Sequence, residues 1–346
     1  MAWYNRQQRH KLNERDRADM RWMWRTIGHE WAIALLQRAI DTGRVSHAYL
    51  FTGPANVGKT HLAKEMAAAL NCTGDAPPCG SCRACLKTAR GTHPDVFLVE
   101  PGNGSIKIDQ IRQLQRQLAL SPYEGRQRIA IIADFQAATV QAANALLKTL
   151  EEPPSRVVLI LAAVDASLLL PTIVSRCQVL PLRGLSCQQI ERALIGRWHE
   201  RPDLARLLSK VSGGRIGWAI SARQDPSILA RRQRSINELQ NLLREGRAAR
   251  MQGAERLSRR GDVATVIRLW QTWWRDMMLI CSGCEELVVN IDRLDVLRGQ
   301  ASQCGLASAK TATRGTEAAL LQMEQNVNTR LLLEVLLLSW KRIRPI

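Results

Sequence analysis

The chain has 346 residues, nine cysteines and a formal net charge of +18. Its length suits roughly two or three domains with hydrophobic cores. No apolar run is long enough to span a bilayer, and residues 331–338 fall far short of it, so we expect a cytoplasmic protein without a membrane partner.

The positive charge is concentrated in one part of the chain. Residues 201–260 hold 14 Lys/Arg against 5 Asp/Glu, which is a balance of +9. The positive electrostatic field of such a stretch would attract nucleic acid or an acidic partner. Arginine-rich helix faces that are merely solvated would give the same excess of positive charge. Charge alone therefore does not predict a DNA site.

The first residues have no apolar periodicity. We expect residues 1–23 to form a basic, disordered leader, with Met20 or Met23 as alternative start sites to Met1. No secretory signal is recognisable there, so a reducing compartment is the expectation.

A phosphate-binding motif follows the first predicted strand. The apolar run 48–52 predicts a buried parallel strand, residues 53–60 (GPANVGKT) match G-x-x-x-x-G-K-[ST], and residues 62–70 continue as a helix. This order of strand, loop and helix is the context in which the motif binds phosphate. The alternatives are a glycine-rich turn that binds nothing and a vestigial loop that binds nucleotide weakly.

Four residues of this loop are candidate nucleotide ligands. Gly53 and Gly58 permit a tight loop whose backbone N–H groups face phosphate oxygens. Lys59 adds a positive charge for the outer phosphates, and the hydroxyl of Thr60 suits Mg²⁺. The loop therefore predicts binding of ATP or ADP with Mg²⁺.

Four cysteines have the spacing of a structural zinc site. Cys72, Cys79, Cys82 and Cys85 are separated by six, two and two residues, with turn residues between them. Four thiolates would fill a tetrahedral shell and leave no position for water, so the site would be structural. The alternative is two disulfides, which a reducing compartment disfavours.

The remaining five cysteines lack such spacing. They are the lone pair Cys281 and Cys284, expected at a helix end, and Cys177, Cys187 and Cys304, expected to be buried or incidental thiols.

The rest of the chain alternates strands and helices and then becomes helical. The predicted elements are a helix containing Ile33, Leu36 and Ile40, strands at 95–99, 129–132, 157–161 and 177–180, an amphipathic helix from Ile108 to Leu118, and a helix from the N-cap Thr139 through Leu150. Ser186 and Gln189 form a capping box, after which only helical patterns occur. The fold class is therefore an α/β domain with a parallel sheet covered on both faces, followed by all-helical domains.

Several stretches together resemble the clamp-loader ATPases of bacterial DNA polymerase III, which belong to the AAA+ family. They are residues 47–53, the cysteine cluster, Asn144–Pro154 and Ser175-Arg-Cys177. The motifs cover residues 27–182, and the resemblance continues beyond them in architecture only. It implies an AAA+ nucleotide-binding domain at 24–182 with a zinc insertion at 72–85, a helical lid at 183–230 and a helical collar or oligomerisation domain at 231–346.

Two branches of the family carry such a four-cysteine zinc insertion, the tau/gamma motor and the delta-prime subunit. The motor carries Asp-Glu after its third strand, where this chain has Ala133 and Asp134, so metal and water would be poorly placed for hydrolysis. The polar residue usual at the tip of the fourth strand is missing, because residues 162–164 read AAV. Residues 213–219 also lack the Arg-Asp-Ala sequence that is typical of the lid of the motor subunit. These departures favour the delta-prime branch with weak or absent ATPase activity of its own, although the complete P-loop is more typical of the motor.

The resemblance implies a stator subunit for ATP-driven loading of the sliding clamp onto primed DNA. Its partners would be the tau/gamma and delta subunits of a hetero-pentameric ring, and Arg176 would be an arginine finger for a neighbouring ATP site. The alternative for Arg176 is an internal salt bridge. The alternative function is an ATP-hydrolysing motor of the tau/gamma type, or another DNA-dependent AAA+ ATPase.

A tryptophan stripe marks the helical part. Trp270, Trp273 and Trp274 fall on one helix face, and we expect core or collar packing there rather than a platform for bases.

Overall fold

The computed structural model describes residues 24–325 and 327–343, and the chain divides into two compact units. The first unit comprises the residues up to 185 together with 215–217, and the second comprises 186–214 and the residues from 218 onward. The predicted leader at 1–23 lies outside the described residues. The division of the helical part into a lid and a collar at residue 230 stays a prediction.

The first unit is built on a five-stranded sheet with the order β2-β3-β4-β1-β5. All neighbouring strands are parallel. The strands are β1 (Ala48–Thr52), β2 (Val96–Val99), β3 (Arg128–Ile132), β4 (Val157–Ala163) and β5 (Gln178–Pro181). Every residue of β1, β3 and β4 is buried, as expected for apolar runs in a sheet that is covered on both faces.

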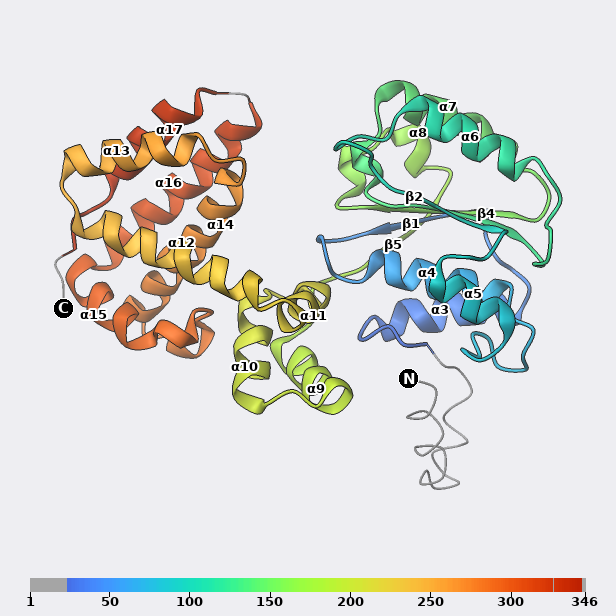
Figure 1. The fold of residues 1–346 in the computed structure, drawn as a ribbon, viewed down its shortest axis with the longest axis horizontal. Helices are drawn as coiled ribbons and strands as arrows, with labels where there is room; N and C mark the ends of the chain where they lie inside the picture. Colours follow the sequence, from blue (N-terminus) through green and yellow to red (C-terminus); the bar gives the residue numbers. More distant parts are fainter. Residues whose placement is uncertain (1–23, 326, 344–346) are drawn as a thin grey trace. The chain divides into compact units, whose positions relative to one another are not determined.

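Helices cover both faces of this sheet (Figure 1). One face carries α3 (Glu30–Asp41), α4 (Lys59–Leu70) and α5 (Arg83–Arg90), and the other carries α6 (Ile108–Leu118), α7 (Val140–Glu151) and α8 (Pro171–Val174). The predicted α/β class with a covered parallel sheet is therefore confirmed. Helices α5 and α8 had not been predicted, because they are short and show no full apolar period.

Local signals begin two of the helices at the expected residues. The Thr139 hydroxyl accepts a hydrogen bond from the N–H of Ala142 at 3.2 Å and caps α7. Ser186 and Gln189 form the expected capping box at the start of α9 (Cys187–Trp198). These side chains satisfy backbone donors that the first helical turn leaves without partners.

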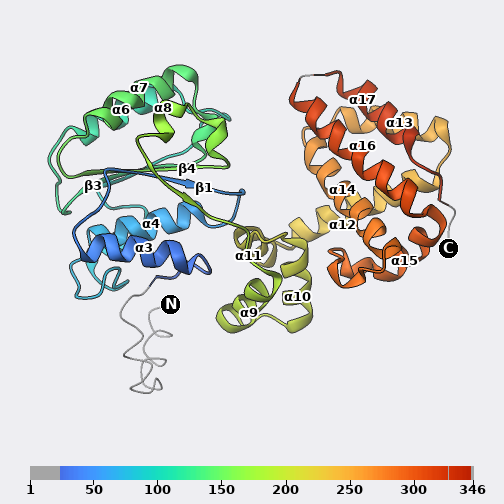
Figure 2. The same cartoon turned by 180° about the vertical axis from the view of Figure 1, so that it is seen from behind.

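The second unit is helical (Figure 2). After α9 its helices are α10 (Pro202–Val211), α11 (Ile216–Gln224, whose first two residues cluster with the first unit), α12 (Pro226–Arg244), α13 (Arg247–Ser258), α14 (Val263–Cys281), α15 (Leu294–Cys304), α16 (Leu306–Glu324) and α17 (Thr329–Ser339). Among the described residues, no helix has the length and apolar character needed to cross a membrane.

The tryptophan stripe forms the centre of this unit. Trp270, Trp273 and Trp274 of α14 are fully buried, and Trp270 packs edge-to-face against Trp340 with ring centroids 5.6 Å apart. The indole N–H of Trp270 donates to the carbonyl of Ser235 at 2.9 Å. Because no ring face is open to solvent, the stripe is core packing and not a platform for bases.

Candidate nucleotide and metal sites

The P-loop joins β1 to α4 in the predicted order. Gly53 has a φ of +142°, and a Cβ there would lie 2.0 Å from the carbonyl oxygen of Leu182. Only glycine fits this position, because any side chain would collide with the backbone that follows β5. Helix α4 begins at Lys59, and its N-terminus opens directly onto the loop, which suits an anion.

Lys59 is buried against its own loop. Its Nζ donates to the carbonyl oxygens of Gly53 at 2.7 Å and of Pro54 at 2.9 Å. Burial lowers the pKa of Lys59, and the nearby carboxylate of Asp134 opposes this shift. A nucleotide phosphate would therefore have to replace carbonyl oxygens as the partner of this ammonium group. Thr60 follows it in α4 and is half-buried.

Two segments outside the loop contact its carbonyl groups. Gly217 donates its N–H to the oxygen of Asn56 at 2.8 Å, and His29 Nε2 lies 3.2 Å from the oxygen of Val57. A Cβ at position 217 would lie 2.9 Å from the Asn56 oxygen, so the approach requires glycine. The sequence contained no spacing that predicted either contact.

The end of β3 carries the predicted departures from a hydrolytic site. Ala133 is buried and has no metal-binding group, and Asp134 follows it in a left-handed conformation with a φ of +46°. The side chain of Gln136 accepts from the N–H of Val164 at 3.2 Å and approaches Asp134 Oδ1 at 3.5 Å. The side-chain amide of Gln136, which follows β3, thus reaches the apolar tip of β4. Sequence reasoning had not predicted this contact.

The four cysteines converge at the N-terminus of α5. All four Sγ atoms lie within 4.8 Å of one another. The Cys72–Cys82 and Cys79–Cys85 sulfur pairs are 3.9 Å and 4.0 Å apart. A tetrahedral zinc with Zn–S bonds of about 2.3 Å separates its sulfurs by about 3.8 Å. The group therefore has the size of a tetrahedral metal site, and the sulfurs are too far apart for disulfides.

Backbone donors already face these sulfurs. The N–H groups of Cys79, Cys82 and Cys85 point at the sulfurs of Cys72, Cys79 and Cys82, at 3.3–3.4 Å. Burial alone would raise the pKa of Cys82, but backbone donors outweigh it and lower the pKa to about 6. Burial raises the pKa of Cys72 and Cys85, so these two thiols would be ionised only with a cation bound beside them. The four residues together could hold a metal ion. No other group of three or more metal-binding side chains occurs among the described residues.

Arg176 follows α8 at the surface of the first unit. Its guanidinium forms an ion pair with Glu151 at 2.8 Å and donates to the carbonyl oxygen of Thr172 at 2.9 Å. Its side chain is 35% exposed. The internal salt bridge considered for this residue is therefore present, and the guanidinium also remains accessible.

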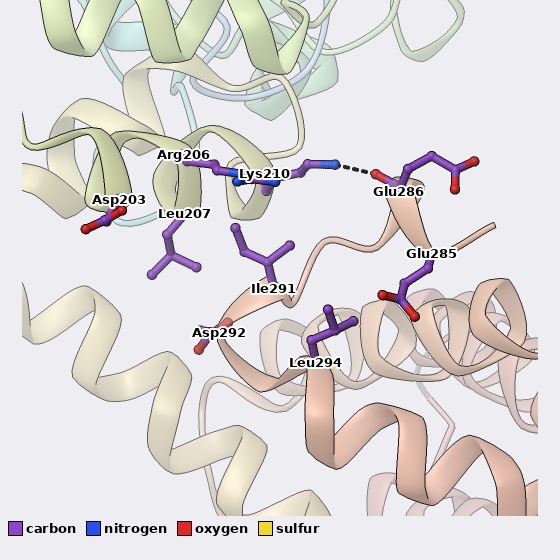
Figure 3. A pocket seen from close by; sticks show the side chains of 9 residues that line it. All are labelled: Asp203, Arg206, Leu207, Lys210, Glu285, Glu286, Ile291, Asp292 and Leu294. Carbon is purple, nitrogen blue, oxygen red and sulfur yellow. Dashed lines mark hydrogen bonds between the residues drawn. The ribbon is translucent and has the colours of Figure 1, made fainter. Parts of the chain in front are cut away.

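A separate groove lies within the second unit, between α10 and residues 285–294 (Figure 3). Leu207, Ile291 and Leu294 line it with apolar surface, and Lys210 Nζ donates across it to the carbonyl oxygen of Glu286 at 2.6 Å. None of the predicted site residues lines this groove.

Together these features define a class: a P-loop α/β domain that carries a four-cysteine module and is followed by a helical unit. A family model described as DNA polymerase III, delta subunit, matches residues 28–186. The chain is 32% identical over 309 residues to subunit delta' of DNA polymerase III from Bacillus subtilis, covering 88% of this chain and 93% of that relative. The chain belongs to the family of DNA polymerase III delta-prime subunits, so the resemblance inferred from the sequence is confirmed.

Two further relatives match over about half of this chain. Subunit delta' of Pseudomonas aeruginosa is 40% identical over 194 residues, covering 54% of this chain and 58% of that protein. Subunit tau of Escherichia coli is 35% identical over 202 residues, covering 56% of this chain and 31% of tau. A solved DNA polymerase III gamma subunit-related protein from Thermotoga maritima is 20% identical, with a TM-score of 0.46, covering 89% of this chain and 98% of that one.

Proposed function

We propose that the chain is the stator of a clamp loader in DNA replication. It would hold one end of a ring with tau/gamma and delta subunits and take part in ATP-driven loading of the sliding clamp onto primed DNA. Membership of the delta-prime family supports a clamp-loader role. The observation that carries the stator assignment is Ala133 beside a complete P-loop, because alanine offers no oxygen to organise Mg²⁺.

The P-loop in this proposal binds ATP or ADP without turning it over. Gly53, Gly58, Lys59 and Thr60 would hold the phosphates and Mg²⁺. Lys59→Ala is expected to abolish nucleotide binding while the chain stays folded. The carbonyl partners of Lys59 lie near solvent-exposed loop residues, and losing these two hydrogen bonds costs about 1–2 kcal/mol of stability. Titration with a fluorescent nucleotide and a thermal melt measure the two effects, with Lys64→Ala of the same helix as the control.

Arg176 would act on the ATP site of a neighbouring subunit. A guanidinium brought beside the γ-phosphate stabilises charge that develops in phosphoryl transfer, and such fingers contribute on the order of 10³ in rate. The accessible guanidinium of Arg176 supports this role, since its contacts to Glu151 and Thr172 can be exchanged.

An ATPase assay of the purified chain tests the stator assignment. We expect no turnover by the chain alone, with or without primed DNA, and turnover by the ring that contains it. The complete P-loop favours one other candidate, a motor of the tau/gamma type. Turnover by the isolated chain that is lost in Lys59→Ala would establish the motor and exclude the stator.

A further inference from the structure

We propose that Glu151 is a positioning residue for Arg176 and sets the direction in which its guanidinium faces a neighbouring ATP. The inference rests on the proposed finger role of Arg176. Glu151 Oε1 lies 2.8 Å from Arg176 NH2, and Arg176 NH1 donates to the carbonyl oxygen of Thr172 at 2.9 Å. Two acceptors on different elements, α7 and the start of α8, therefore fix the plane of one guanidinium.

The position of Glu151 in its helix argues against a role within that helix. It is the last residue of α7, where the helix dipole places partial negative charge. A carboxylate is unfavourable at that end, and the sequence offers a second acid at Glu152 and then two prolines. The ion pair with Arg176 offsets this cost. It therefore explains why a glutamate stands at an unfavourable position in the helix.

The pair orients Arg176 without using all of its hydrogen-bond donors. Both side chains are partly exposed, at 35% for Arg176 and 50% for Glu151, and ion pairs of this kind contribute little to folding. Guanidinium carries five N–H donors, so two contacts leave capacity for a phosphate oxygen. A γ-phosphate oxygen can therefore bind a free N–H group of Arg176 while Glu151 still holds the guanidinium.

The geometry predicts which kinetic parameter Glu151 controls. Removing its charge leaves Arg176 in place but lets the guanidinium rotate about its long side chain. The chemical step suffers, because it depends on the guanidinium being aligned with the γ-phosphate. Binding of ATP to the neighbour is unaffected, because the P-loop of that neighbour supplies most of the phosphate contacts.

The test uses the ring reconstituted from the full chain and the tau/gamma and delta subunits of the same organism. Glu151→Gln is expected to lower kcat for ATP turnover and the rate of clamp loading about 10-fold without changing the KM for ATP. Glu152→Gln is the matched control, since it removes the adjacent acid, which has no ion pair among the described residues, and it should behave as wild type. Arg176→Ala should lower ATP turnover more than Glu151→Gln does. Adding Glu151→Gln to Arg176→Ala should lower turnover no further.

Four results would contradict these expectations. A ring with Arg176→Ala that works at the wild-type rate would overturn the finger role and the inference with it. A loss in Arg176→Ala without one in Glu151→Gln would overturn the positioning role alone. An additive loss in the double variant, or an equal loss in Glu152→Gln, would show that Glu151 acts on something other than Arg176.

Discussion

Arg250 is a buried arginine without a carboxylate partner among the described residues. Its side chain donates to the carbonyl oxygens of Leu242 and Leu243 at the end of α12, and of Leu337 and Trp340 at the end of α17. Helix C-termini carry partial negative charge and carbonyl groups without helical donors. One guanidinium therefore joins two helix ends through hydrogen bonds to carbonyl oxygens, and Glu245 acts on it only at longer range.

Replacing Arg250 should destabilise the second unit. Arg250→Met keeps an unbranched apolar stem but leaves buried carbonyl oxygens without donors, at an expected cost of about 3 kcal/mol in the free energy of unfolding. Urea denaturation measures the change. Arg256→Met on the exposed side of the same helix is the control and should change stability by less than about 0.5 kcal/mol. Equal effects of the two substitutions would show that the capping role is wrong.

At the scale of elements, Asp95 connects β2 to the loop before β3. Its carboxylate is buried and accepts backbone N–H groups from Tyr123, Glu124 and Gly125 at 2.7–2.9 Å, with Arg128 nearby at 3.7 Å. Burial alone would raise the pKa of Asp95, but these donors outweigh it and the pKa is lowered. The ionised carboxylate therefore stabilises the fold.

This shift predicts an acid-dependent loss of stability. A carboxyl group whose folded pKa lies below its unfolded value stabilises the fold fully above the unfolded value, about pH 4, and progressively less as the pH falls through its folded pKa. The difference in unfolding free energy between wild type and Asp95→Asn should thus be constant near neutrality and shrink below about pH 4. Denaturant titrations across this range measure it. A difference independent of pH would show that hydrogen-bond geometry, and not ionisation, matters at Asp95.

The cysteine module is an element that a metal would complete. It packs against α4, where Ala68 lies in one buried cluster with Cys72 and Cys85. We expect one tightly held Zn²⁺ per chain in protein purified without added zinc. Chelation should speed amide exchange in residues 72–90 and leave β3 and β4 protected. Less than half a zinc per chain, or disulfides found by mass spectrometry, would contradict the zinc assignment.

Sequence patterns predicted the elements that local chemistry specifies. The strands β1, β3 and β4 are apolar runs, and Thr139 and Ser186 are caps whose effect lies within one helical turn. The same patterns placed the P-loop and the four cysteines, because in both sites the ligands are close together in the sequence. The fourth strand was predicted at residues 157–161, but β4 extends to Ala163, because these two small apolar residues continue its buried run.

The contact partners that sequence reasoning did not identify all lie far apart in the sequence. Gly217 meets Asn56, Gln136 meets Val164, and Glu151 meets Arg176. Glu151 belongs to the recognised stretch Asn144–Pro154, but it lies just beyond the predicted end of the helix at Leu150, and no local pattern indicated a partner for it. Its partner becomes evident only when α7 and α8 are placed on one face of the sheet.

For the whole molecule, the net charge overstates the basic surface that a partner would meet. Within the basic stretch 201–260, Arg232 and Arg250 are buried. Other arginines of this stretch are in ion pairs, including Arg223 with Glu200 and Arg260 with Asp262. Part of the charge count thus has a structural role, and the field available for nucleic acid is smaller than the sequence suggests.

Helix α17 carries an apolar stripe that its own unit does not cover. One face packs Leu333 and Leu337 in the core. Leu331, Val335 and Leu338 recur at helical spacing on another face and are 58%, 72% and 38% exposed. Apolar side chains that gather on one face of a helix mark interaction surfaces. This stripe suits the predicted oligomerisation role of residues 231–346, in which helices of neighbouring subunits would cover it.

Placing a charge on this stripe should block assembly while the chain stays folded. Val335→Asp adds a carboxylate that stays hydrated in the free chain but would lose its water in a subunit interface. Size-exclusion chromatography with the tau/gamma and delta subunits should show loss of the ring, while thermal melting and zinc content of the isolated chain stay unchanged. Leu287→Asp is the control, because Leu287 is also an exposed leucine of this unit but lies outside α17. A ring that forms normally with Val335→Asp would exclude the stripe as a subunit contact, and equal loss with Leu287→Asp would point to a general effect of the added charge.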